Sequence, residues 1–244
     1  MANAWVRDRA RLFYCAFGFY SLAAVAFGFS TTYILPMARQ SFVAPPIVHL
    51  HGALCLTWVL LFIIQCVMVR SGQTRLHRRL GLTGVPNALG ILISGMGTAK
   101  WATERDLATV PTALTTMIGT LTSLVIFLVF VIAGVAMRRR PDWHKRFMML
   151  ATVAVLWPAF FRFRHLMPWV PRPDIWLGLV LADMPILFAA VRDRLVYGRV
   201  HPVWAIFGSL LVAEQSFEVI VFETHVWGKL GALIYRILSF QMVT

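Results

Sequence analysis

The sequence predicts an all-α polytopic membrane protein: a bundle of seven transmembrane helices, with the N-terminus inside the cell and an amphipathic helix at the C-terminal end. Three observations carry this prediction. Of the 244 residues, 59% are hydrophobic and 14% are charged, whereas a soluble domain has about 45–50% and about 25%. The apolar residues form seven runs, each near the roughly 20 residues that cross a bilayer. Basic residues alternate between the connections.

This composition excludes a disordered protein, a nucleic-acid-binding module and an ordinary cytosolic enzyme. The net charge of +13 would favour a nucleic-acid partner in a soluble chain, but here it is better explained by basic residues in cytoplasmic loops. The expected partners are therefore the lipid bilayer and the anionic lipids of its cytoplasmic face, with no nucleic acid. Cys15, Cys55 and Cys66 lie in apolar runs without metal-site spacing and are expected to be buried thiols.

The first predicted span covers residues 12–35, a run too long and too aromatic for a cleaved signal peptide. Pro36 closes this run and Pro45-Pro46 opens the second. Pro111 and Pro202 stand where the first turn of a helix tolerates proline. The other six predicted spans are 46–69, 79–98, 112–136, 146–166, 174–191 and 202–223.

Three prolines fall inside predicted spans: Pro86, Pro158 and Pro185. Each removes a backbone hydrogen bond and is expected to kink its helix. In lipid the freed carbonyl groups need other partners, so these stretches are expected to face protein or water.

The 23 Lys and Arg residues orient the bundle, because the richer side of a bacterial membrane protein faces the cytoplasm. Eight lie on the other side, among them Arg39, Lys100, Arg105 and Arg172. The richer set consists of Arg7, Arg9, Arg11, Arg70, Arg75, Arg78, Arg79, Arg138, Arg139, Arg140, Lys145, Arg146, Arg192, Arg194 and Arg199.

Residues 1–224 are predicted to form the transmembrane domain and residues 225–244 an interfacial helix. The tail has an apolar face, interrupted by Lys229 and Arg236, that suits the membrane surface. A short eighth span is the alternative. The apolar face consists of Leu230, Leu233, Ile234, Ile237 and Leu238.

Seven spans invite comparison with rhodopsins and G-protein-coupled receptors. The lysines are Lys100, Lys145 and Lys229, and none lies inside a predicted span to hold retinal. The predicted topology is the reverse of that of the receptors. No phosphate loop, zinc-protease motif or nucleophile elbow is present, so no catalytic residue is assigned.

Ionisable residues at membrane depth are functional candidates, and several are expected in the outer half of the bundle. Glu214 and Glu218 are four residues apart and share a helix face, as do Arg162 and His165 at a spacing of three. Together with His49 and His51, which lie two residues apart, they form the predicted outer cofactor site. Such a set would suit haem iron, copper or a carboxylate-bridged metal pair. The alternative is a structural ion pair from Arg162 to Glu214 or Glu218.

A second candidate group lies at the inner face, where three helices begin with histidines beside basic residues: His77, His144 and His201. If they converge, they would suit an anionic group such as a lipid phosphate, or a quinone-like carbonyl. A histidine pair near each membrane surface is also what a two-haem electron-transfer bundle requires. The alternative is that these residues face lipid headgroups.

The stretch from His49 to Gly84, with His-Leu-His-Gly-Ala-Leu, Trp58, Gln65 and Leu-His-Arg-Arg-Leu-Gly, resembles a widespread group of bacterial multi-pass membrane proteins without an assigned function. The segments starting at His144 and Gly198 are similar to that group as well. The group is loosely similar to transmembrane b-type cytochromes and to oxidase-assembly membrane proteins. The resemblance implies a multi-pass protein of the bacterial inner membrane and favours haem slightly.

Three hypotheses follow. The first is a redox membrane protein, with haem b as the favoured cofactor and a transition metal as the second choice. The second is a non-catalytic assembly or accessory subunit with a membrane protein partner. The third is a small-solute or proton transporter that uses Asp183, Glu214 and Glu218.

Overall fold

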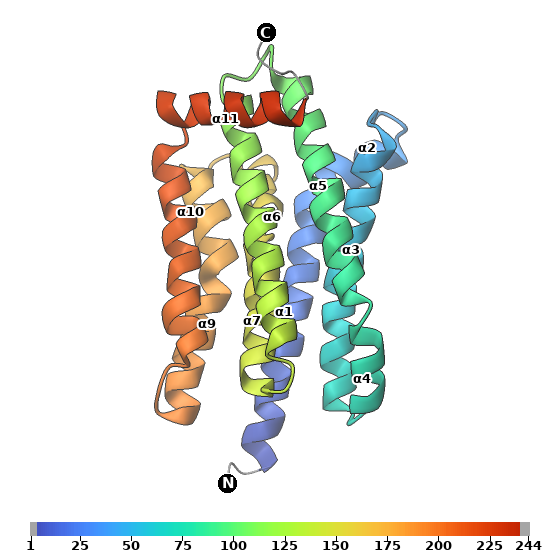
Figure 1. The fold of residues 1–244 in the computed structure, drawn as a ribbon, viewed down its shortest axis with the longest axis vertical. Coiled ribbons are helices and arrows are strands. Elements are labelled where there is room, and N and C mark those ends of the chain that lie inside the picture. The colour runs from blue at the N-terminus through green and yellow to red at the C-terminus, as the bar shows by residue number, and fades with distance from the viewer. Residues whose placement is uncertain (1–3, 240–244) are drawn as a thin grey trace.

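The computed structural model describes residues 4–239, and side chains from residue 12 onward. These residues form an elongated bundle of helices without a β-strand (Figure 1). Seven helical segments are long and apolar enough to cross a membrane, which confirms the predicted helical membrane bundle. They are Leu12–Ala38, Pro46–Arg70, Thr74–Asp106, Ala113–Ala136, Pro141–His165, Asp174–Tyr197 and Val203–Val221.

Several spans consist of more than one helical element. In chain order the elements are α1 (Ala4–Phe29), the π-helix η1 (Ser30–Ile34), α2 (Leu35–Ala38), α3 (Pro46–Arg70), α4 (Thr74–Gly81), α5 (Gly84–Asp106), α6 (Ala113–Ala136), α7 (Pro141–Ala154), α8 (Trp157–Phe161), the 3₁₀-helix η2 (Arg162–His165), the π-helix η3 (Asp174–Leu181), α9 (Ala182–Tyr197), the π-helix η4 (Val203–Gly208), α10 (Ser209–Val221) and α11 (His225–Leu238).

The three internal prolines behave differently. Pro86 lies in the first turn of α5, where a proline costs nothing, so the predicted kink at Pro86 is replaced by the break between α4 and α5. Pro158 lies in the first turn of α8, just after the break that ends α7. Pro185 alone stands inside a helix, α9.

The carbonyl oxygen of Leu181 is the one that Pro185 leaves without its helical donor. The hydroxyl of Tyr20 on α1 donates to this oxygen at 2.5 Å. A backbone group freed by proline in lipid must find such a partner inside the protein. The contact therefore ties α1 to the start of α9.

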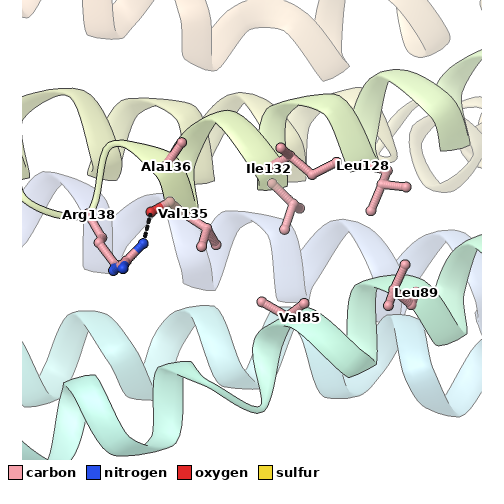
Figure 2. Close-up of a pocket in the computed structure, with 8 residues that line it drawn as sticks. Val85, Leu89, Leu128, Ile132, Val135, Ala136 and Arg138 are labelled. Carbon is pink, nitrogen blue, oxygen red and sulfur yellow. Dashed lines mark hydrogen bonds between the residues drawn. The ribbon is translucent and has the colours of Figure 1, made fainter.

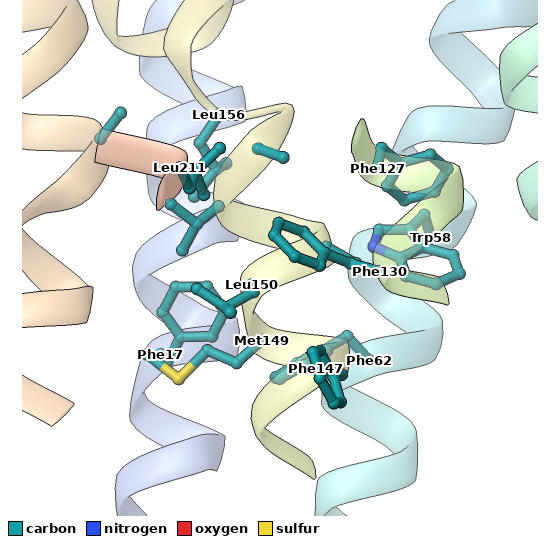
Figure 3. Packing of buried hydrophobic residues seen from close by; sticks show 14 of the residues in the cluster. Phe17, Trp58, Phe62, Phe127, Phe130, Phe147, Met149, Leu150, Leu156 and Leu211 are labelled. Carbon is teal, nitrogen blue, oxygen red and sulfur yellow. The ribbon is translucent and has the colours of Figure 1, made fainter. Parts of the chain in front are cut away.

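The hydrophobic core lies between α1, α3, α6 and α7 (Figure 3). Helix α7 is at its centre, and Met149, Leu150 and Val153 have no exposed surface. Trp58 of α3 packs edge-on against Phe127 of α6. Its indole nitrogen donates to the Thr152 hydroxyl of α7 at 3.1 Å, so the core contains a satisfied polar link between helices.

The two ends of the bundle differ. One end, which we name the basic end, carries α4, the α6–α7 connection and the α9–η4 connection; the other carries α2 and α11 (Figure 1). Helix α11 lies across the ends of the spans and packs on α6 through Gly231, whose missing Cβ leaves room for the Leu114 backbone. Val226, Leu230, Leu233 and Ile237 form an exposed apolar stripe on it, as an interfacial helix requires.

Candidate functional site

Three carboxyl groups from two neighbouring spans gather at membrane depth, and we name Asp183, Glu214 and Glu218 the carboxyl cluster. Glu214 and Glu218 stand one turn apart on α10, within hydrogen-bond reach of each other. Glu218 also accepts from the Thr122 hydroxyl of α6. Gly119 of α6 faces this carboxyl group, since a Cβ there would lie 3.3 Å from Glu218 Oε2.

Asp183 completes the cluster from α9, within electrostatic range of Glu214. Its side chain is 7% exposed, and neither carboxyl oxygen has a hydrogen-bond partner among the described residues. It lies in the first turn of α9, directly after the π-helix η3 and two residues before Pro185. Departures from regular α-helix of this kind are frequent at functional sites.

No Lys or Arg side chain among residues 12–239 lies at ion-pair distance from the carboxyl cluster. Two ionised carboxylates one helical turn apart repel each other in a low dielectric, so the pair favours the uptake of a proton. Gln215, beside the cluster on α10, is 4% exposed and has neither amide atom hydrogen-bonded within the described chain. The region can therefore bind protons or polar groups.

The other residues of the predicted outer site lie in separate surroundings. Nδ1 of His49 is 2.8 Å from the Tyr33 hydroxyl. His51 lies 3.1 Å from Ser94 Oγ through Nδ1, and 3.5 Å from the Cys55 thiol through Nε2. Because Ser94 donates its own proton to Gly90, His51 donates to Ser94 and accepts from Cys55. Both of its nitrogens are thus occupied.

Arg162 does not form the ion pair with Glu214 or Glu218 that was predicted from the sequence as the structural alternative. Its Nη1 donates to the Pro158 carbonyl at 2.7 Å, and its Cζ lies 4.3 Å from the centre of the Phe29 ring. The reason is that α8 ends at Phe161, and the 3₁₀-helix η2 that follows packs on α1. His165, at the end of η2, is exposed.

The six residues of the predicted outer site therefore do not meet in one cluster in this structure. His51 has no free nitrogen, and His165 lies at the surface rather than beside the two carboxyl groups. Within residues 12–239, no three His, Cys, Asp or Glu side chains are placed to hold one metal ion. Of the six residues in the predicted site, the structure brings together only Glu214 and Glu218.

At the basic end, two of the three inner histidines meet. The ring centres of His77 and His144 are 6.3 Å apart and the rings are nearly perpendicular. His144 donates from Nδ1 to the Gly134 carbonyl at 2.8 Å. With its amide oriented to satisfy both neighbours, Gln65 donates to Nδ1 of His77 and accepts from the Gly81 N–H.

His201 lies apart from that pair. Its Nε2 is 3.3 Å from the Asp142 carboxylate, and its Nδ1 accepts from the Val203 N–H at 3.2 Å. Burial, followed by the nearby Arg146 guanidinium, lowers the pKa of His201, and the Asp142 carboxylate offsets part of this effect. The three histidines therefore do not form one site.

A buried ion pair that was not predicted from the sequence joins Arg146 of α7 to Asp193 of α9, which are 2% and 1% exposed. Arg192 donates to the second oxygen of Asp193 at 3.0 Å, and the Trp204 indole donates to the first at 3.1 Å. One signal was available: Asp193 stands between two arginines in a basic connection. An acidic residue in such a basic segment indicates a specific ion pair.

An apolar groove of about 290 Å³ opens between α5 and α6 (Figure 2). Val85, Leu89, Leu128 and Ile132 line it, and Arg138 stands at one end, donating to the Val135 carbonyl at 3.3 Å. Of the residues that line the groove, only Arg138 is titratable. The groove is therefore separate from the carboxyl cluster and has no acid–base group besides that arginine.

Comparison of the chain with models of protein families, with curated proteins and with solved structures finds no match in any of the three.

Proposed function

We propose that this protein is a proton-translocating or proton-coupled transporter of a bacterial inner membrane, with its basic end in the cytoplasm. One observation carries the proposal: Asp183, Glu214 and Glu218 gather at membrane depth without a cationic partner in the described chain. Carboxyl groups inside a membrane are costly and are typical of proton relays in pumps and transporters.

The surroundings of the cluster support this proposal. Thr122 holds Glu218 by one hydrogen bond, while the buried Asp183 has none, so the carboxyl groups of the cluster have different surroundings. The π-helices η3 and η4 begin the two spans that carry the cluster. Segments of π-helix within a helix are frequent at functional sites.

Proton flux into liposomes tests the proposal. The purified full chain is reconstituted, a potassium gradient with valinomycin sets the membrane potential, and an internal pH dye follows proton entry. We expect entry several-fold faster than in empty liposomes, and at least a tenfold loss in Glu214→Gln and Asp183→Asn. Glu223→Gln is the matched control, because Glu223 is exposed just beyond the same helix.

A second measurement does not need an unknown co-transported solute. Infrared difference spectra between two pH values report protonated carboxyl groups through their C=O stretch. The wild-type protein should give such a band, and Glu214→Gln should remove much of it. Absence of both the flux and a titrating band that depends on Glu214 or Asp183 would overturn the proposal.

The redox hypothesis has one supporting observation, the His77–His144 pair at the basic end. His144 donates through Nδ1 to a backbone carbonyl, which leaves Nε2 free in the manner of a metal-ligating histidine. His77 fits less well, because an Nδ1 that accepts from Gln65 leaves the proton on Nε2. A haem b absorption in the purified protein that is lost in His144→Ala would favour this second candidate.

A further inference from the structure

A second polar site lies at the basic end, where α1, α7 and α9 meet. Tyr14 of α1 is 6% exposed, and its hydroxyl is buried without a hydrogen-bond partner among the described residues. Lys145 of α7 places its Nζ 5.3 Å from the centre of the Tyr14 ring. Arg192 of α9 places its Cζ 5.3 Å from the ring of Phe13, whose centre is 5.4 Å from that of the Tyr14 ring, so its charge is within electrostatic range of Tyr14. We name Tyr14, Lys145 and Arg192 the Tyr14 pocket.

The nearest carboxylate cannot satisfy these groups, because its oxygens are already taken. One oxygen of Asp193 accepts from Nε and Nη2 of Arg146 and from Trp204, and the other accepts from Nη1 of Arg192. Nη2 of Arg192 is buried and has no partner in the described chain. The Tyr14 hydroxyl, the Lys145 ammonium and Nη2 of the Arg192 guanidinium are therefore donors without a carboxylate of their own, and the pocket carries an excess of positive charge.

We propose that the Tyr14 pocket binds a phosphate group, supplied by the headgroup of an anionic phospholipid. A phosphate offers several oxygens to several donors at once and carries the charge that the pocket lacks. Basic pockets between transmembrane helices are recognised headgroup sites. Tyr197, whose ring centre lies 5.6 Å from Arg192 Cζ, is 43% exposed, so the pocket borders the outer surface of the bundle, where lipid lies. The pocket is independent of the carboxyl cluster.

Thermal unfolding of the detergent-purified full chain tests this proposal, because a ligand that binds only the folded state raises its stability by an amount that grows with the logarithm of ligand concentration over Kd. The protein is titrated with dioleoylphosphatidylglycerol, with dioleoylphosphatidylcholine, and with inorganic phosphate. We expect saturable stabilisation by phosphatidylglycerol and none by phosphatidylcholine. Tyr14→Phe and Lys145→Gln should each weaken the apparent affinity about tenfold.

Tyr14→Phe is the sharper variant, because it removes only a hydroxyl that no described residue uses. Arg139→Gln is the matched control for Lys145→Gln, since it removes one positive charge from the exposed α6–α7 connection. Stabilisation by inorganic phosphate with the same dependence on Tyr14 and Lys145 would support the site but assign it to a soluble phosphate. Equal responses of wild type, Tyr14→Phe and Arg139→Gln, or no saturable response, would overturn the proposal.

Discussion

The guanidinium of Arg146 donates two hydrogen bonds to one oxygen of Asp193, from Nε at 3.0 Å and from Nη2 at 2.6 Å. Both side chains are almost fully buried. Such a pair fixes α7 against α9, because neither charge is stable in the bundle without the other.

Asp193→Asn should therefore lower the free energy of unfolding by about 3–5 kcal/mol, since it leaves Arg146 buried without its counter-charge. Urea or thermal unfolding in detergent measures this loss. Asp106→Asn is the control, because Asp106 pairs with Arg105 at the surface and an exposed pair contributes about 0–1 kcal/mol. Equal losses in the two variants would contradict the role of the buried pair.

Tyr20 and Pro185 should be energetically coupled through the carbonyl of Leu181. Tyr20→Phe leaves that buried oxygen without a donor, at a cost of about 1–3 kcal/mol. Pro185→Ala restores a backbone N–H to α9, so the same Tyr20→Phe change should cost much less in that background. A double-mutant cycle of unfolding free energies measures the coupling; additive effects would show that Tyr20 does not replace the missing donor.

His201 should make the stability of the basic end depend on pH. Its pKa is lowered in the folded protein, so its contribution is fully present above the unfolded value of about 6.5. As the pH falls from 6.5 through the lower folded value, the unfolded state takes up the proton first and stability decreases. His201→Gln should lose less stability than wild type between pH 7.5 and 5.5; parallel curves would contradict this expectation.

The topology can be tested by reporter fusions. Fusions after Gly72, Arg140 and Gly198 should report the cytoplasm, because the basic residues concentrate in the connections at that end. Fusions after Arg39, Arg105 and Arg172 should report the opposite compartment. A cytoplasmic signal after Arg105 would contradict the proposed orientation.

The spans were predictable because length and hydropathy decide where a helix crosses a bilayer. The predicted 112–136 and 46–69 correspond to Ala113–Ala136 and Pro46–Arg70. The proximity of Glu214 and Glu218 to each other was predictable as well, because residues four apart in one helix lie on the same face.

Contacts between helices were not predictable in the same way, because they depend on how each helix is rotated and where it ends. A continuous helix through residue 166 would have carried Arg162 on toward the outer end, but the change to a 3₁₀ turn after Phe161 directs the residue to α1. Asp183 was grouped with Glu214 and Glu218 in the transporter hypothesis but was not placed in the predicted outer site, because the sequence does not show that α9 brings it near Glu214. The Arg146–Asp193 pair was missed for the same reason.

The carboxyl cluster lies much nearer to helix α11 than to the basic end, so the paths that join it to the two ends of the bundle differ in length. Glu218 precedes the end of α10 at Val221 by less than one turn, so it lies about 5 Å below the plane in which α11 rests. From Glu214 to the start of η4 at Val203, the span runs roughly 15 Å. In the proposed transporter, a proton arriving from the α11 side would cross a thin layer, whereas its exit toward the basic end would have to pass the packing around Trp204, which is 2% exposed. Most of the transmembrane voltage would therefore fall across that inner segment, which makes it the step whose rate responds to the membrane potential.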